Sequence, residues 1–562
     1  LLPSTALQGF PPPGSHPRVT LSLSSPPPMA PAIGAQSGGG ARANLYKGQA
    51  MHAYIIMIGL VAGCGGLLFG YDIGVSGGVI SMPAFQQKFF PSVYDKAQAA
   101  AEGDTDPYCT FDDQLLQLFS SSLYLAGMAI SLPAAILTRR MGRKITMLIA
   151  SLFFLVGSGI NAGAVNTAML IVGRILLGFG IGSANSVVPL YLSEAAPHKW
   201  RGAMTMLFQL TVTIGIFAAS LINYGVNEHG SDNGWRLSLG LAGVPAVILF
   251  IASLILPETP NSLIERGRVE EGRRVLAKLR NISVEEVDTE FEDIREAAVS
   301  AAAVSPAAQW RALFAPRNRP ALITTCLIAG FQQLTGINAI MFYAPQIFQT
   351  IGSGHSSALL SAVVINSVNV ACTFVAIYAV DRFGRRGLFL EGGVQMIATL
   401  FAAGALIAVE FNKYTSLPSS AAAGLLVIVC IYDAGFSWSW GPLGWLVPSE
   451  IQAMDVRGAG MGAAVIINFL FTFFIGQAFL SMMCGMKFGV YFFFGAWVII
   501  MTLFIYFFLP ETAGVPIEEV QLTFARHPLW RKVMGPAADE VIAASEKRDL
   551  VVKQGQAESG SF

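Results

Sequence analysis

The sequence predicts an all-helical membrane protein with about twelve transmembrane helices in two similar halves of six. Two observations predict this class. Of the 562 residues, 53% are hydrophobic and only 12% are charged, whereas a soluble domain carries roughly a quarter charged residues. Apolar runs of about 20 residues, enough to cross ~30 Å of hydrocarbon as a helix, recur along the chain. The formal net charge of zero gives no electrostatic basis for a nucleic-acid partner.

Each apolar run is predicted to be a helix, because backbone groups in lipid must be hydrogen-bonded within their own segment. The first half is expected to contain helices at 54–78, 116–137, 144–164, 168–191, 203–224 and 236–256. The second half is expected to contain helices at 320–350, 357–380, 387–409, 421–447, 459–482 and 488–509.

The segments between and around these runs predict the domain organisation. It comprises a disordered N-terminal segment 1–50, a first half 51–256 that includes a long loop 81–115, a helical linker 257–318, a second half 319–510 and a tail 511–562. The N-terminal segment is rich in Pro, Gly, Ser and Ala and cannot bury enough apolar area to fold. We expect Met29 to be the natural start, with leader sequence before it, and disorder after about residue 530.

Basic residues in short loops predict the orientation of the spans. The loop after the second span carries Arg139, Arg140, Arg143 and Lys144, and the matching loop of the second half carries Arg382, Arg385 and Arg386. Loops 165–167 and 351–356, on the opposite side, carry no basic residue. We therefore expect both termini and the linker to be cytoplasmic, and the acidic loop 81–115 to be extracellular. The linker is predicted to form short amphipathic helices. These helices either hold the two halves together or serve only as a passive connection.

The two halves contain the same short sequence motifs. Three pairs of motifs recur in the same order, about 250 residues apart: Arg140-Met-Gly-Arg-Lys144 with Arg382-Phe-Gly-Arg-Arg386, Pro189-Leu-Tyr-Leu-Ser-Glu194 with Pro448-Ser-Glu450, and Pro257-Glu-Thr259 with Pro510-Glu-Thr512. Parallel repeats of this kind are a transporter architecture. Their charges form a predicted cytoplasmic network of Arg143, Glu194, Arg201, Glu258, Arg385, Glu450, Arg457 and Glu511. We expect these charges to pair between helices when the inside is closed, although plain interfacial anchoring also explains them.

Further motifs give the chain a resemblance to a known family. They are Phe69-Gly-Tyr-Asp-Ile-Gly74, Val172-Gly-Arg174, Pro257-Glu-Thr-Pro260, Gln332-Gln-Leu-Thr-Gly-Ile-Asn338 and Asp381-Arg-Phe-Gly-Arg-Arg386. With these motifs, residues 46 to 530 resemble the sugar porter branch of the major facilitator superfamily, and more narrowly its plant and algal monosaccharide–proton symporters. Asn261 fits the plant branch. Thr138 departs from the pattern, because the first basic loop lacks the acidic residue that Asp381 supplies in the second.

Two charged residues, Asp72 and Arg174, stand out inside the predicted spans. Both fall in the outer half of the bilayer, where an isolated charge costs roughly 3 kcal/mol or more, so a pair is expected. The proton affinity of a carboxyl depends on burial and on nearby cations, so a changing Asp–Arg distance would load or release a proton. The resemblance implies that Asp72 is the protonation site and Arg174 its partner, since related facilitators that move no proton carry a neutral residue there. A static buried ion pair is the alternative.

Amides inside the apolar spans suit a neutral, hydroxyl-covered ligand, because each amide both donates and accepts hydrogen bonds. Gln332, Gln333 and Asn338 lie in one predicted span, although buried amides also tie helices together. The resemblance assigns sugar contacts to Phe69, Gln209, Ile216, Gln332, Gln333, Asn338, Asn369 and Trp445. Trp445 follows Gly441 and Pro442, which are expected to break the tenth span.

The resemblance also implies an extracellular lid, loop 81–115, which a Cys109–Cys484 disulfide ties to the second half. The remaining cysteines are expected to pack as small apolar residues. No metal-ligand spacing, cofactor loop or nucleophile–base set occurs in the sequence. An enzyme or a cofactor is therefore not expected, and a proton serves as the coupling ion.

The predicted function is proton-coupled import of a monosaccharide, with glucose as the expected hexose, by a monomeric multi-pass protein of the plasma membrane. Its expected partners are sugar, proton and lipid bilayer. A passive hexose facilitator is the first alternative, and a sugar sensor that does not transport is the second.

Overall fold

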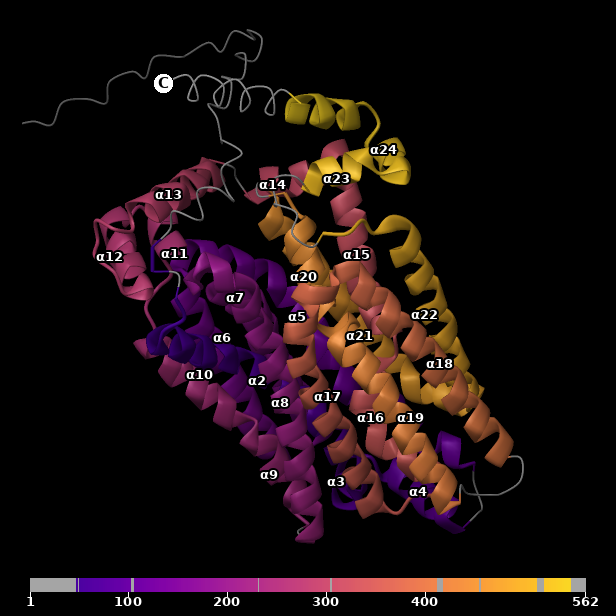
Figure 1. Cartoon of the computed structure of the whole chain (residues 1–562). Helices are drawn as coiled ribbons and strands as arrows, with labels where there is room; N and C mark the ends of the chain where they lie inside the picture. Colours follow the sequence, from indigo (N-terminus) through magenta and orange to yellow (C-terminus); the bar gives the residue numbers. More distant parts are fainter. Residues whose placement is uncertain are drawn as a thin grey trace, which may run out of the picture.

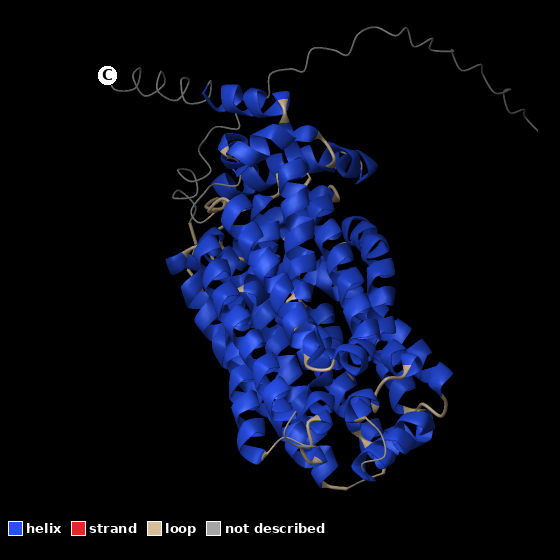
Figure 2. Cartoon of the chain, turned by 90° about the vertical axis from the view of Figure 1, so that its right-hand side faces the viewer, coloured by secondary structure: helices blue, strands red, loops and turns tan. Residues whose placement is uncertain are grey.

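In a computed structural model of the chain, the described residues are 47–48, 50–102, 106–230, 232–303, 306–411, 418–453, 456–512 and 520–546. Every regular element in these ranges is a helix (Figure 2). Within the same ranges, twelve helical segments are long and apolar enough to cross a membrane. The predicted class, a twelve-span helical membrane protein, is thereby confirmed. Residues 1–46 of the predicted disordered segment lie outside the described residues.

The first half consists of the spans α2 (Ala53–Ser81), α5 (Gln114–Met141), α6 (Arg143–Ala162), α7 (Thr167–Ala195), α8 (Arg201–Glu228) and the pair α9 (Gly234–Leu241) and α10 (Gly243–Ile255). A short turn of 3₁₀ helix, η2 (His198–Trp200), joins α7 to α8. The most extensive packing in this half is between α2 and α8 and between α7 and its neighbours α5 and α6. The sequence did not predict the break between α9 and α10.

The second half consists of η3 (Pro316–Asn318), α15 (Arg319–Leu334), α16 (Ile337–Thr350), α17 (His355–Phe383), α18 (Arg385–Phe411), α19 (Ser419–Trp438), α20 (Trp440–Ile451), α21 (Arg457–Met486) and α22 (Gly489–Phe508). Two of its spans are broken. The tenth breaks at Ser439, close to the predicted Gly441-Pro442 site. The seventh breaks at Thr335 and Gly336, between α15 and α16, within a run that the sequence predicted as one helix.

The two halves lie side by side, one in indigo and magenta and the other in orange and yellow (Figure 1). One end of the bundle carries α3 (Pro83–Phe89), α4 (Pro91–Glu102) and η1 (Pro107–Cys109), and we call it the lid end. The opposite end carries α11 (Pro260–Glu265), α12 (Val269–Arg280), α13 (Asp288–Ala303) and α14 (Pro306–Leu313), and we call it the linker end. The linker contacts both halves, through α11 against α7 and α14 against α21.

The chain after the last span is helical, including residues just past 530 for which disorder was predicted; residues 547–562 lie outside the described residues. Helices α23 (Val520–Arg526) and α24 (Pro528–Met534) lie at the linker end (Figure 1), and helical backbone continues to residue 546. Trp530 is buried, its ring packs against Phe508 and Phe524, and its Nε1–H donates to the carbonyl of Phe508 at 2.6 Å. This aromatic anchor supplies the buried apolar area that composition alone did not reveal.

The internal repeat is visible in the backbone of the two basic loops. Gly142 and Gly384 both adopt positive φ, +98° and +77°, a region that glycine enters at least cost. A Cβ on Gly142 would meet the carboxylate of Glu258, and one on Gly384 would meet that of Glu511. The glycine of each basic motif therefore makes room for the glutamate of the matching Pro-Glu-Thr motif, which explains why these motifs recur together.

Candidate functional site

The predicted charge pair forms between α2 and α7. Nη1 of Arg174 lies 2.5 Å from Oδ1 of Asp72, and both side chains are buried from solvent. Residues 102 positions apart in the chain are thus joined because the two helices pack at this level. A guanidinium and a carboxylate at hydrogen-bond distance compensate each other's charge in a medium that would otherwise disfavour both.

Two further groups hold Arg174 in place. Its Nη2 donates to Oγ of Ser76 at 3.0 Å, and Ser76 donates in turn to the backbone carbonyl of Asp72 at 2.8 Å. The ring of Phe119 lies 4.0 Å from the guanidinium carbon, a cation–π contact. The arginine therefore keeps two partners that do not depend on the charge of Asp72.

The predicted amides of the seventh span lie at the break between α15 and α16. Gln332 donates from Nε2 to the carbonyls of Trp440 at 3.1 Å and Gly441 at 2.8 Å. It also accepts at Oε1 from Asn468 of α21, at 2.8 Å. Gln333 and Asn338 hydrogen-bond to each other across the break. These buried amides therefore link the two broken spans of the second half to α21.

The remaining predicted ligand residues are spread over several helices. Asn369 of α17 is buried and donates to Asp433 of α19 at 2.9 Å. Phe69 is buried, with its ring centroid 6.2 Å from that of Phe469 in the second half. Ile216 is buried on α8, beside α2, whereas Gln209 and Trp445 are only partly buried. No hydrogen bond among the described residues ties Asn369 to the Gln332 cluster.

Direct contacts join α2 and α5 of the first half to α16 of the second half. Nε2 of Gln346 on α16 donates to the carbonyl of Gly77 on α2 at 2.7 Å. Nearby, the rings of Tyr124 and Phe342 stack with centroids 5.4 Å apart, which joins α5 to α16. Tyr124 also packs against Phe69, with ring centroids 6.5 Å apart. Gln346, Phe342 and Tyr124 thus join α2 and α5 of the first half to α16 of the second.

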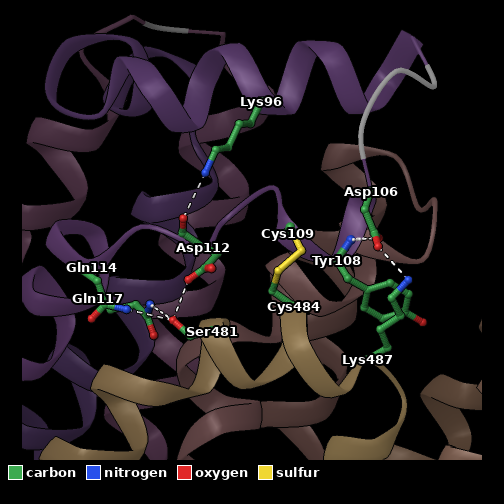
Figure 3. The surroundings of a disulfide bond; sticks show 10 residues. All are labelled: Lys96, Asp106, Tyr108, Cys109, Asp112, Gln114, Gln117, Ser481, Cys484 and Lys487. Atoms are coloured by element: carbon green, nitrogen blue, oxygen red, sulfur yellow. Dashed lines mark hydrogen bonds and ion pairs between the residues drawn. A yellow bond between two sulfur atoms is a disulfide. The ribbon is translucent and has the colours of Figure 1, made fainter.

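The lid is fastened to the second half by a covalent bond and an ion pair (Figure 3). The sulfur atoms of Cys109 and Cys484 form a disulfide, as the resemblance implied, with Cα atoms 4.5 Å apart. Beside it, Nζ of Lys487 lies 2.7 Å from Oδ2 of Asp106. Partial burial opposes charge on Asp106, but hydrogen bonds from Lys487 and from the Tyr108 N–H outweigh it and lower the pKa of Asp106.

A polar cluster lies on the other side of the disulfide in Figure 3. Gln114 and Gln117 of α5 both donate to Oγ of Ser481, at 2.9 and 3.0 Å. Ser481 donates to the lid carboxylate Asp112 at 2.6 Å. Covalent and hydrogen-bonded contacts thus join the lid, the first half and the second half at one place.

At the linker end, the repeated charges pair within each half. Arg143 lies 2.7 Å from both Glu194 and Glu265, and Arg385 lies 2.9 Å from Glu450. Glu258 accepts from the backbone N–H of Arg143 at 3.0 Å, and Glu511 accepts from that of Arg385 at 3.0 Å. Arg457, in the second half, lies close enough to Arg201 of the first half and to Glu450 to interact electrostatically with both.

Sequence reasoning missed several residues of these networks. Besides Asp72 and Arg174, further carboxyls lie within the spans. Asp433 is fully buried in α19, and Glu391 of α18 accepts a hydrogen bond from Trp438. The sequence feature that could have revealed Asp433 is its position as a lone aspartate in the apolar run 421–436. Arg280 of the linker is also buried, and it donates to the carbonyls of Ala195 and Ala196. Asn468 carried only the weak signal of one amide in an apolar helix. Among the described residues, no three His, Cys, Asp or Glu side chains gather to hold a metal ion.

Comparison with known proteins places this arrangement in a family. H(+)/hexose cotransporter 2 of Parachlorella kessleri is 60% identical over 517 residues, which cover 92% of this chain and 95% of the relative. Sugar transport protein 10 of Arabidopsis thaliana is 52% identical, over 89% of this chain and 96% of the relative. The solved structure of the proton:xylose symporter XylE bound to 6-bromo-6-deoxy-D-glucose matches with a TM-score of 0.68 and 25% identity, over 84% of this chain and 98% of XylE. An inward-open, partially occluded structure of XylE from E. coli has a TM-score of 0.67 and 24% identity, over 82% of this chain and 99% of XylE, and supports the fold.

A family model also matches most of the chain. Residues 58–524 fit the family described as Sugar (and other) transporter. This range includes the lid, the linker and the twelve spans except for the first residues of α2. The chain is therefore a member of the Sugar (and other) transporter family.

Proposed function

We propose that this protein moves a hexose, with glucose as the expected substrate, together with a proton by alternating access. The observation that carries the proposal is the buried Asp72–Arg174 pair between α2 and α7. Its relatives include proteins named H(+)/hexose cotransporters, which supports proton coupling over passive facilitation. No cofactor is required, because the proton is the coupling ion.

The coupling follows from the geometry of the pair. In the described conformation, where Gln346 of α16 hydrogen-bonds to Gly77 of α2, Asp72 contacts Arg174. In this proposal Asp72 is then charged, because the guanidinium compensates the carboxylate. When the lid side opens and the two side chains separate, the buried carboxyl takes up a proton to avoid an unpaired charge. Ser76 and Phe119 continue to hold Arg174 meanwhile. Closure of the lid side restores the pair and displaces the proton toward the linker side.

We propose that the sugar binds between the halves, against Gln332, Gln333 and Asn338 at the break of the seventh span. Asn369 and Gln209 would add amide contacts, with Phe69, Ile216 and Trp445 as apolar surfaces for the ring. Phe69 lies one helical turn from Asp72 on α2 and touches the ring of Phe469. It is thus positioned to relate sugar occupancy to the state of the charge pair.

The same proposal fixes the orientation and the surroundings. We place the lid end outside the cell and the linker end, with both termini, in the cytoplasm of a cell whose plasma membrane the protein spans as a monomer. The Cys109–Cys484 disulfide then lies in an oxidising compartment, where such bonds persist. The charge network of Arg143, Arg385 and their glutamates then lies at the cytoplasmic ends of the helices.

Uptake into proteoliposomes tests the function. Wild-type protein is expected to concentrate labelled D-glucose when a pH gradient, acidic outside, is imposed, and only to equilibrate it without the gradient. Asp72→Asn is expected to equilibrate glucose in both conditions. The matched control is Asp95→Asn, which removes an exposed lid carboxylate and is expected to accumulate like the wild type.

The outcomes separate the alternatives. Accumulation by Asp72→Asn would overturn the assignment of the proton site. Equilibration by the wild type with and without a gradient would identify a passive facilitator, and no flux at all would favour a sugar sensor.

A further inference from the structure

A second buried carboxyl lies in the second half, and neither the charge pair nor the linker network involves it. Asp433 is on α19, near the middle of the span Ser419–Ile451, and its side chain is 0% exposed. An ionisable residue inside a membrane span is costly to bury, so a functional reason for its presence is expected.

One of the two carboxyl oxygens of Asp433 accepts a hydrogen bond, and the other does not. Its Oδ1 accepts from Nδ2 of Asn369 at 2.9 Å, whereas its Oδ2 is buried without a partner. The Oδ1 of Asn369 is likewise buried without a partner. Among the described residues, the amide of Asn369 is the one donor that reaches this carboxyl. One neutral hydrogen bond offsets little of the cost of burying a negative charge.

In the part of the chain that the structure describes, no Lys or Arg lies near Asp433 on α16, α17, α18 or α20, the helices that pack against α19. The sequences of α16, α19 and α20 contain no Lys or Arg. Arg382 of α17 lies 13 residues from Asn369, or roughly 20 Å along the helix, where it contacts Tyr378. Arg385 and Arg386 of α18 are likewise at the linker end, bound to Glu450 and to the carbonyl of Tyr506.

The titratable groups near Asp433 are neutral or acidic. Cys372 of α17 and Cys430 and Tyr432 of α19 interact with it electrostatically, and the Tyr432 hydroxyl donates elsewhere, to the carbonyl of Thr335. On α18, Glu391 is engaged with Trp438. On α20, Glu450 pairs with Arg385. None of these groups compensates a negative charge at Asp433.

We propose that Asp433 holds a proton in this conformation and forms, with Asn369, a second proton-binding site that is linked to sugar binding. The protonated carboxyl carries an O–H donor on Oδ2, and Asn369 carries a free acceptor on Oδ1. A sugar hydroxyl needs one of each. The link to sugar rests on the proposed role of Asn369, whereas the protonation of Asp433 does not.

The protonation state is tested by infrared spectroscopy of the full-length protein in lipid vesicles at neutral pH, comparing wild type, Asp433→Asn and Asp72→Asn. The wild type minus Asp433→Asn spectrum is expected to show the C=O band of a protonated carboxyl. Loss of a carboxylate band instead would show that Asp433 is ionised and would overturn the proposal. Asp72→Asn is expected to lose a carboxylate band, because its partner Arg174 keeps that residue charged. Isotope labelling of aspartate in the wild type gives the same distinction if Asp433→Asn does not fold.

The link to sugar is tested by measuring D-glucose affinity against pH in the Asp72→Asn background, which removes the first proton site. Affinity is expected to fall by about tenfold as pH rises and Asp433 loses its proton, a typical coupling between two sites. The double variant Asp72→Asn/Asp433→Asn is expected to bind with a flat pH profile. A fall that persists in the double variant would overturn the linkage. Failure of the proposed transport function would appear separately, as absent accumulation by the wild type.

Discussion

The two halves of this transporter each bury one carboxyl near the level of the predicted ligand residues, and they treat it in opposite ways. In the first half, Asp72 contacts Arg174 at 2.5 Å. In the second half, Asp433 accepts a single hydrogen bond from the amide of Asn369 and, within the described residues, has no cationic partner. Equal burial therefore does not imply equal charge.

The difference teaches how one repeated architecture can hold two kinds of proton site. A paired carboxylate releases its proton when the partner approaches, so its occupancy depends on the distance between two helices. An unpaired carboxyl keeps its proton for as long as it stays out of water, so its occupancy depends on access. Proton occupancy of the paired carboxyl therefore changes when the two halves move relative to each other. Proton occupancy of the unpaired carboxyl changes when water or a ligand reaches it.

The largest effect is expected from a substitution that leaves Asp72 without a cationic partner, as Asp433 is among the described residues of the second half. Arg174→Gln removes the cation and leaves Asp72 buried alone, which typically costs about 3–5 kcal/mol of folding stability. We expect a large drop in thermal stability and loss of glucose accumulation, measured by unfolding in detergent with lipid and by proteoliposome uptake.

The double variant Asp72→Asn/Arg174→Gln provides the control for that experiment. It removes both charges, so much of the lost stability is expected to return, while accumulation stays absent. If Arg174→Gln alone were as stable as the wild type and still accumulated glucose, the ion pair would not be the device that sets the charge of Asp72.

A smaller loss of stability is expected at the linker end, where each half contains an Arg–Glu pair. The Arg143–Glu194 side chains are 4% and 9% exposed, against 13% and 23% for Arg385–Glu450. Arg143 also binds Glu265. Arg143→Gln is therefore expected to lower the free energy of unfolding more than Arg385→Gln does, by roughly 1–3 kcal/mol. Thermal unfolding would show this as a lower unfolding temperature for Arg143→Gln.

Exposed Arg268→Gln serves as the control for this pair, because its partner Glu271 is also exposed and its loss is expected to change stability very little. Equal losses for Arg143→Gln and Arg385→Gln would mean that burial does not distinguish the two halves at this end.

The smallest effect is expected at the lid, where the carboxylate is near water. The Asp106–Lys487 pair lowers the pKa of Asp106, so its contribution is present above the ordinary Asp value of about 3.9 and is lost only as pH falls through the lowered value. Between about pH 5 and pH 8 this contribution is constant. Asp106→Asn is therefore expected to leave the shape of the pH–uptake profile unchanged. A profile that shifts in this variant would assign part of the pH dependence to the lid instead of the buried carboxyls.

The sequence was sufficient for the fold, because the hydrocarbon thickness and the need to satisfy backbone hydrogen bonds leave few alternatives for long apolar runs. It also predicted the basic loops, the repeated glutamates and the break near Gly441. It did not predict helical structure after residue 530, because the anchoring of Trp530 against Phe508 depends on a distant helix.

The candidate site was predictable only in part. The Asp72–Arg174 pair followed from two opposite charges at one depth, and the Cys109–Cys484 bond followed from family resemblance. By contrast, the hydrogen bonds of Gln332 to Trp440 and Asn468, and the position of Asp433 against Asn369, depend on which helices become neighbours. Spacing along one helix gives depth in the membrane. The identity of the partner across the gap, and hence whether a buried carboxyl is paired or protonated, was decided only by the packing of helices far apart in the chain.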